Sequence, residues 1–250
     1  MKVVILAGGF GTRLSELTKK IPKPMIKIYG KPILEHILNI YVSYGFNNFL
    51  IATGYKSEII VNYFKKYKKK GTSYKLRGLK KTLNIKFINT GINTMTGGRL
   101  KKLEKYFDKK NNEKFMFTYG DGLSNINLNL LKKFHIKNNK IATVSAVRPL
   151  SRYGVLKVKK NLALSFEEKK PIMTSWINGG FFIFNSKIFK FIKNKKTVLE
   201  KHPLQSLAKK RHLAAFKHEG FWHSFDTKRD IDLINSKFNK KKFLSLIYKN

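Results

Sequence analysis

The amino-acid sequence predicts an α/β protein with a mostly parallel, mixed β-sheet flanked by helices and a strand-rich second half. Three observations support this prediction. A buried strand opens the chain and ends at a glycine cluster, strands then alternate with helices of roughly 10–15 residues, and strands become more frequent after Ile141. No segment rich in Pro, Gly or Ser separates the two halves. We therefore expect a single domain over residues 1–250, with halves of about 1–140 and about 141–236.

Each predicted element follows from its local pattern. Lys2–Ala7 is a continuous apolar, largely β-branched run, which is typical of a strand buried on both faces. Pro32–Tyr44 has apolar residues at helical spacing, with a proline at its start and Gly45 after its end. The other elements predicted for the first half are strands at Phe49–Thr53, Ile85–Asn89 and Phe115–Tyr119 and helices at Ser57–Tyr67 and Gly98–Phe107. The strands predicted for the second half are Ala142–Val147, Tyr153–Val158, Leu162–Glu167 and Ile177–Phe184.

The composition is that of a globular protein. Of the 250 residues, 42% are hydrophobic and 13% aromatic, which is enough for a core and argues against a disordered polybasic chain. The absence of cysteine excludes disulfides, cysteine-ligated zinc and thiol catalysis. No apolar run approaches the roughly 18–20 residues of a membrane helix, and Val3–Ala7 is too short for a secretory signal. We expect a cytoplasmic protein without a membrane span.

The net charge is strongly positive, because 53 Lys and Arg residues face 14 Asp and Glu residues and give +39. Such a field raises the local concentration of nucleotides and sugar phosphates. The basic residues are nevertheless spread along almost the whole chain, with the densest stretch at Lys65–Lys81, and RNA-recognition and zinc-finger signatures are missing. We expect a solvated lysine-rich surface and no dedicated nucleic-acid partner.

A glycine-rich loop follows the first predicted strand. It runs Leu6-Ala7-Gly8-Gly9-Phe10-Gly11-Thr12-Arg13-Leu14 and is followed by Pro22-Lys23-Pro24. Glycines let the backbone adopt positive φ and bring N–H groups close to phosphate oxygens. The spacing matches neither the P-loop nor the dinucleotide fingerprint. Arg13 offers a planar fork and Lys23 a point charge, so we expect phosphate binding; the alternative is a tight turn with two surface cations.

Two aspartates are candidates for a metal site. Asp121 lies between two glycines at the end of a predicted strand, where ligands collect in parallel sheets. Asp226 lies in an aromatic segment after Trp222 and Phe225. Carboxylates suit Mg²⁺, which binds proteins through one or two of them. The alternatives are a turn residue for Asp121 and a cap of the helix that begins at Thr227 for Asp226.

Together these motifs resemble those of the sugar-1-phosphate nucleotidyltransferases, whose signature is a Gly-Gly-x-Gly-Thr-Arg-Leu loop followed by Pro-Lys-Pro. The resemblance covers nearly the whole chain. It is closest to the glucose-1-phosphate cytidylyltransferases, because of the stretch Thr94-Met95-Thr96-Gly97-Gly98-Arg99-Leu100. Further similar segments are Phe117–Gly122, Phe166 with Glu168 and Lys169, Ile177–Phe182, Gly220–Trp222 and Asp226–Thr227 with Arg229 and Asp230.

The resemblance implies a Rossmann-like, nucleotide-diphospho-sugar transferase fold and a specific reaction. A cytidylyl group would pass from CTP to a sugar 1-phosphate, glucose 1-phosphate above all, to give a CDP-sugar and pyrophosphate in a Mg²⁺-assisted in-line displacement. The first half would then bind the nucleotide and the second half the sugar phosphate, in a homo-oligomer. Because the attacking phosphate oxygen is already anionic, no general base is needed, and cations must screen two repelling polyanions.

The resemblance also assigns roles to residues. Catalytic roles fall to Arg13, Lys23, Asp121 and Asp226, and the metal would lie between Asp121 and Asp226. Nucleotide binding falls to Leu6, Ala7, Gly8, Gly9, Phe10, Gly11, Thr12, Arg13, Lys23, Thr94, Arg99 and Asp121. Sugar-phosphate binding falls to Gly154, Glu168, Lys169, Asn178 and Gly179. The alternative for Thr94 and Arg99 is a turn and an ordinary surface helix, and for Glu168 and Lys169 a solvated loop.

Some positions depart from the family pattern and bear on the identity of the sugar. An extra lysine, Lys170, precedes Pro171, His202 stands where an acidic residue is expected, and Phe225 stands where Met is expected. Two other functions remain open. One is uridylyl or thymidylyl transfer by the same fold, and the other is non-catalytic binding of a sugar nucleotide or polyanion.

Overall fold

The computed structural model describes residues 1–250 with the exception of 15–17, 78, 80, 150–154, 168–174 and 249–250. An eight-stranded sheet in the order β13-β9-β12-β7-β1-β4-β6-β5 forms its centre. These strands are β1 (Val3–Leu6), β4 (Asn48–Thr53), β5 (Ser73–Tyr74), β6 (Leu83–Asn89), β7 (Lys114–Tyr119), β9 (Ala142–Val147), β12 (Ile177–Asn185) and β13 (Leu213–His218). The predicted mixed α/β sheet is confirmed.

Both parallel and antiparallel pairs occur in this sheet. β1 pairs in parallel with β4 and β7, β4 with β6, and β9 with β13. β12 is antiparallel to β7 and β9, and β5 is antiparallel to β6. Because β12 runs against β7, its first residues lie at the edge of the sheet where β7 ends.

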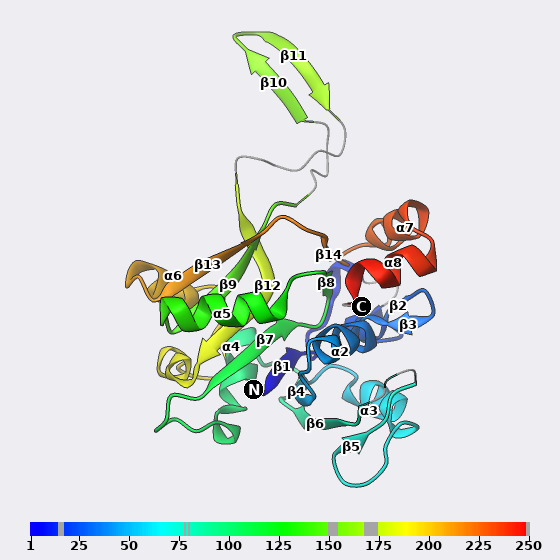
Figure 1. Ribbon diagram of the computed structural model, residues 1–250, viewed down its shortest axis with the longest axis vertical. Coiled ribbons are helices and arrows are strands. Elements are labelled where there is room, and N and C mark those ends of the chain that lie inside the picture. Colours follow the sequence, from blue (N-terminus) through cyan, green and yellow to red (C-terminus); the bar gives the residue numbers. More distant parts are fainter. Residues whose placement is uncertain (15–17, 78, 80, 150–154, 168–174, 249–250) are drawn as a thin grey trace.

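Helices cover both faces of the sheet (Figure 1). The α-helices are α2 (Ile33–Ser43), α3 (Ser57–Lys65), α4 (Thr96–Lys101), α5 (Leu128–Asn138), α6 (His202–Lys209), α7 (Lys228–Lys237) and α8 (Lys240–Ile247). The 3-10 helices are η1 (Thr12–Leu14), η2 (Lys23–Met25), η3 (Glu104–Tyr106) and η4 (Ser186–Phe191). None of the described helices is both long and apolar enough to cross a membrane.

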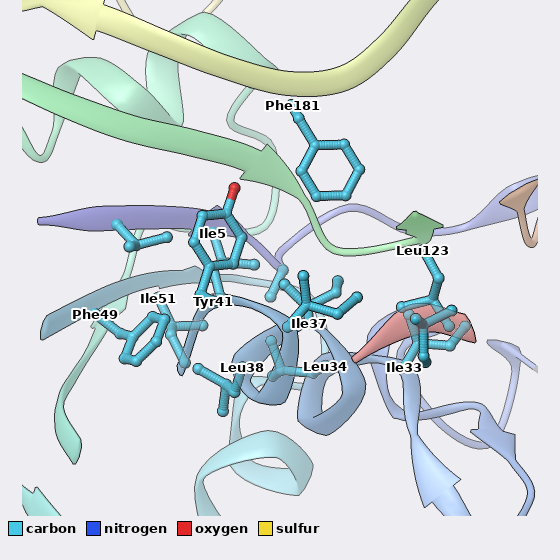
Figure 2. Close-up of a cluster of buried hydrophobic side chains, with 14 of the residues drawn as sticks. Ile5, Ile33, Leu34, Ile37, Leu38, Tyr41, Phe49, Ile51, Leu123 and Phe181 are labelled. Carbon is cyan, nitrogen blue, oxygen red and sulfur yellow. The ribbon is translucent and has the colours of Figure 1, made fainter. Parts of the chain in front are cut away.

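The core consists of two apolar clusters, one on each face of the sheet. Val3 and Ile5 of β1 belong to the first cluster, and Val4 and Leu6 belong to the second. The whole strand is therefore buried, as its uninterrupted apolar run predicts. Figure 2 shows the first cluster, where side chains of α2 such as Ile37, Leu38 and Tyr41 point toward β1 and β4.

Several predicted boundaries differ from the structure by one or two residues, and the largest difference concerns one helix. The helix predicted over Gly98–Phe107 is instead α4, which ends at Lys101, followed by η3. Leu103, between them, is fully buried in the second apolar cluster. The strand predicted over Tyr153–Val158 is described from Val155, and residues 153 and 154 lie outside the described residues.

Three small two-stranded sheets accompany the main one. They are β2 (Lys27–Ile28) with β3 (Lys31–Pro32), β8 (Gly122–Ser124) with β14 (Trp222–Ser224), and β10 (Val155–Lys159) with β11 (Leu162–Glu167). The hairpin of β10 and β11 projects away from the main sheet (Figure 1). The pair β8–β14 joins the chain after β7 to the segment that precedes α7.

Candidate active site

The carboxyl ends of β1, β4, β6 and β7 meet at one edge of the sheet. A glycine follows each of these strands within two residues, and these glycines allow very close backbone approach. A Cβ atom on Gly8 would lie 2.8 Å from the backbone nitrogen of Gly54, and one on Gly120 would lie 2.6 Å from the carbonyl oxygen of Leu6. These glycines therefore bring the loops after β1, β4 and β7 together.

Lys23, Asp121 and Asp226 form a cluster at this edge. The Lys23 Nζ lies 2.6 Å from Asp121 Oδ2 and 2.9 Å from Asp226 Oδ1. Asp121 follows β7, whereas Asp226 follows β14, and the Phe225 N–H donates to the Asp121 carbonyl at 3.0 Å. Pairing of β14 with β8 thus brings together two acids that are far apart in the sequence.

The electrostatics of this cluster favour a protonated lysine. Burial by itself would lower the pKa of Lys23, but the Asp121 and Asp226 carboxylates outweigh it and raise that pKa above its usual value. Ser224 Oγ donates to Asp226 Oδ2 at 2.7 Å and fixes the orientation of this carboxylate. One positive charge therefore lies between two negative ones in a largely buried setting.

The glycine loop lies next to this cluster. Gly11 has φ +66°, and a Cβ atom on it would lie 3.0 Å from Lys23 Cβ. The Thr18 hydroxyl donates to the Gly11 and Leu14 carbonyls, which closes the turn that contains η1 and Arg13. Leu6, Ala7 and Gly8 are buried, whereas Gly9, Phe10 and Thr12 are exposed. The loop thus offers backbone groups at the surface beside a buried ammonium.

Arg99 and Thr94 form hydrogen bonds within the segment that packs against the glycine loop. Arg99 Nη1 donates to Thr90 Oγ1 at 2.6 Å and to the Gly91 carbonyl at 2.8 Å, and Nη2 donates to the Ile92 carbonyl at 3.1 Å. A Cβ atom on Gly8 would lie only 2.3 Å from Arg99 Nη1. Thr94 Oγ1 donates to the Thr90 carbonyl at 2.6 Å. Both side chains are buried, which excludes the alternative of a surface helix.

The residues predicted for the sugar phosphate are only partly described. Asn178 and Gly179 lie at the start of β12, on the same edge as Asp121. The Trp222 Nε1–H donates to the Gly179 carbonyl at 2.7 Å, so this tryptophan helps to orient β12. Gly154, Glu168 and Lys169 lie outside the described residues.

The structure also tests the alternative role of Asp226 as the cap of the helix that begins at Thr227. The cap of α7 is Thr227, whose side chain accepts from the Asp230 N–H, while Asp230 Oδ2 accepts from the Thr227 N–H at 2.6 Å. This is a capping box, so a capping role for Asp226 is wrong. Asp121 does lie in a turn, but its carboxylate contacts Lys23.

Sequence reasoning missed several residues of this edge. Ser224, Tyr119 and Thr90 each contact a predicted site residue or its immediate support. Ser224 lies two residues before Asp226 and Tyr119 two residues before Asp121, at the ends of strands. That placement was the available signal, because strand ends at this edge face the same site.

The donor set fits a divalent ion with few protein ligands. Within the described part of the chain, no group of three or more His, Cys, Asp and Glu side chains could hold a metal. Asp121 and Asp226 instead offer two carboxylates that already share one cation, the Lys23 ammonium. Mg²⁺ commonly takes one or two carboxylates and completes its shell with water and substrate phosphates.

Comparison with known proteins identifies the family of this chain. The nucleotidyl transferase family model matches residues 2–231. The chain is 42% identical to a probable glucose-1-phosphate cytidylyltransferase from Bacillus subtilis, over 96% of this chain and 97% of the relative. It is 41% identical to a glucose-1-phosphate cytidylyltransferase from Salmonella typhimurium, over 92% and 93% of the two chains. The crystal structure of HddC from Yersinia pseudotuberculosis superposes with a TM-score of 0.71 at 26% identity, covering 95% of this chain and 99% of the other. The chain is therefore a member of the nucleotidyl transferase family.

Proposed function

We propose that this protein transfers the cytidylyl group of CTP to glucose 1-phosphate and releases CDP-glucose and pyrophosphate. The observation that carries the proposal is the Lys23 ammonium held between Asp121 and Asp226 beside the glycine loop. Two relatives with at least 41% identity are named glucose-1-phosphate cytidylyltransferases, which supports the choice of nucleotide and sugar.

The reaction is an in-line displacement at the α-phosphorus of CTP. A phosphate oxygen of glucose 1-phosphate forms the new P–O bond, and the bond to the leaving pyrophosphate breaks. Since the nucleophile is already an anion, the protein supplies positioning and positive charge rather than a base. We assign Lys23 to a position between the attacking and transferred phosphates, and the backbone N–H groups of residues 8–12 to the β- and γ-phosphates. The proximity of Lys23 to Asp121 and to Gly11 of the loop supports this assignment.

Asp121 and Asp226 would hold a divalent cation, which we propose to be Mg²⁺. When bound there, it would neutralise charge on the α-phosphate region and so lower the cost of bringing two polyanions together. The Lys23 ammonium, which now lies between the two carboxylates, would then be available to substrate phosphates.

The base and sugar selectivity is proposed from the same set of residues. Thr94 and Arg99 shape the nucleotide side, since they hold the backbone beneath Gly8. We assign the sugar hydroxyls to Asn178, Gly179 and Glu168, the charge that faces the sugar phosphate to Lys169, and close backbone approach to Gly154. A homo-oligomer and a cytoplasmic location stay predictions.

A substrate panel tests this function. The protein is incubated with Mg²⁺, each of CTP, UTP, dTTP, ATP and GTP, and a set of sugar 1-phosphates, and products are identified by mass with pyrophosphate release as the rate. We expect CDP-glucose as the main product. A preference for UTP or dTTP would replace the nucleotide in the proposal, and no product from any pair would refute the enzymatic function.

A further inference from the structure

Glu200 connects two parts of the candidate site that are distant in sequence. It is half-buried and lies just before α6. Its Oε2 accepts a hydrogen bond from Thr96 Oγ1 at 2.6 Å, and its Oε1 accepts one from the Tyr119 hydroxyl. Among the described residues no lysine or arginine forms a salt bridge with Glu200, although the chain is rich in lysine. Two hydroxyl donors therefore stabilise this carboxylate.

The hydrogen bond with Thr96 connects Glu200 to the residues that we propose bind the nucleotide. Thr96 is the first residue of α4, in the same stretch as Thr94 and Arg99. The chain before Glu200 packs tightly on this helix, because the Gly98 N–H donates to the Thr197 carbonyl at 3.1 Å and a Cβ atom on Gly98 would lie 2.4 Å from the Lys195 carbonyl. The Glu200–Thr96 hydrogen bond thus fixes where α4 begins.

The hydrogen bond with Tyr119 connects Glu200 to the residues that we propose bind the sugar phosphate. Tyr119 ends β7, two residues before Asp121, and the Asn178 side chain also hydrogen-bonds to it. The Tyr119 ring lies against Gly180, where a Cβ atom would be 3.0 Å from the ring. The Tyr119 hydroxyl donates to Glu200 Oε1, so the carboxylate holds the ring against the start of β12.

We infer that Glu200 is a positioning residue that couples nucleotide recognition to sugar-phosphate recognition, by holding the start of α4 through Thr96 and Asn178 of β12 through Tyr119. The inference rests on the proposed function and deepens it. Glu200 itself contacts neither substrate in this account, and its effect passes through Thr96 and Tyr119. Removing the hydrogen bond from Thr96 or from Tyr119 should weaken the binding of one substrate. Removing the carboxylate charge of Glu200 should weaken the binding of both substrates.

Steady-state kinetics on three variants tests this coupling. We expect Tyr119→Phe to raise KM for glucose 1-phosphate about tenfold and leave KM for CTP within about twofold, and Thr96→Val to do the reverse. Glu200→Gln should raise both KM values about tenfold. Glu104→Gln is the matched control, because Glu104 is also half-buried but pairs with Lys101 and Lys109, and it should behave like the wild type.

Thermal unfolding of the same variants separates positioning from general destabilisation. The inference is overturned if Glu200→Gln lowers the melting temperature but leaves both KM values unchanged, or if Tyr119→Phe and Thr96→Val each affect both substrates equally. If Glu200→Gln fails to fold, the contrast between Tyr119→Phe and Thr96→Val decides. Wild-type turnover with unchanged kinetics in all variants overturns this inference alone, whereas absence of wild-type turnover overturns the proposed function and this inference with it.

Discussion

Lysines occur in two very different settings in this molecule. Lys23 is 9% exposed and lies within 2.9 Å of two carboxylates at the carboxyl edge of the sheet. The segment Lys65–Lys81, which runs from the last residue of α3 to just before β6, contains no acidic residue, and most of its lysines are exposed. There Lys66 packs over the rings of Tyr63 and Tyr67 at 4.3 and 4.9 Å.

The difference shows that the position of a lysine, rather than the number of lysines in the chain, decides whether its charge can act in the chemistry of a site. An exposed ammonium is surrounded by water and salt, which screen its field within about 8–10 Å. An ammonium buried beside carboxylates acts in a low-dielectric setting, where each charge has a much larger effect. The net charge of +39 therefore says little about function, while one buried lysine says a great deal.

Removal of divalent ions should have the largest effect on the buried setting. With excess chelator we expect turnover to fall by at least about 10³-fold and to return with added Mg²⁺. The fold should change little, because the Lys23 ammonium lies within 2.9 Å of both carboxylates and can offset their charge. Turnover assays and circular dichroism in the same buffers check this. Full activity in chelator would contradict the metal role of the two acids.

Replacing a lysine in each setting sharpens the comparison. Lys23→Met keeps the length of the side chain but removes its charge, so we expect kcat/KM to fall about 10²–10³-fold. Lys69→Met, in the exposed segment, is the matched control and should remain within about twofold. Equal losses in the two variants would mean that the total charge, and not its position, supports turnover.

Buried histidines extend the comparison to pH. His36 is fully buried, with Nε2 near the Ile28 carbonyl and Nδ1 near the Tyr248 hydroxyl, and burial lowers its pKa to about 4. The unfolded chain binds the proton more tightly, so stability is complete above pH 6.5 and is lost as the pH falls toward 4.

We therefore expect the unfolding free energy of the wild type to drop by about 2 kcal/mol more than that of His36→Gln between pH 7.5 and pH 5. Urea titrations at both pH values measure it. Parallel pH dependence in the two proteins would show that His36 does not titrate as its burial requires.

The smallest effect is expected from the exposed lysines together. Changing Lys65, Lys68, Lys69 and Lys70 to Gln should lower kcat/KM by about twofold to threefold at low salt, through weaker attraction of the anionic substrates. The loss should disappear near 0.15 M salt because of screening. A loss that persists in salt would point to a direct contact between this segment and a substrate.

Much of the fold could be predicted because its signals are local. The apolar run that became β1, and the helical spacing with Pro32 and Gly45 around α2, each specify an element from neighbouring residues. The break after α4 could not be predicted in this way. It occurs where Leu103 enters the core, and that depends on residues distant in sequence.

The residues of the site also differ in how far local signals predict their placement. Asp121 and the glycine loop stand at strand ends, so their placement follows from the parallel sheet. The contacts of Lys23 with Asp226, and of Glu200 with Thr96 and Tyr119, join residues 203, 104 and 81 positions apart. No local pattern encodes such contacts, and Glu200 was accordingly missed, whereas the position of Tyr119 at the end of β7 did offer a signal.

Single-turnover formation of CDP-glucose by Asp226→Ala, beside Asp232→Ala as a control on the exposed face of α7, tests the account most directly. With CTP, glucose 1-phosphate and Mg²⁺ we expect product from the wild type and the control at similar rates, and about 10³-fold slower formation from Asp226→Ala with its fold retained. Product formation by Asp226→Ala at a rate near that of the wild type would contradict the assignment of the reaction to the Lys23, Asp121 and Asp226 cluster.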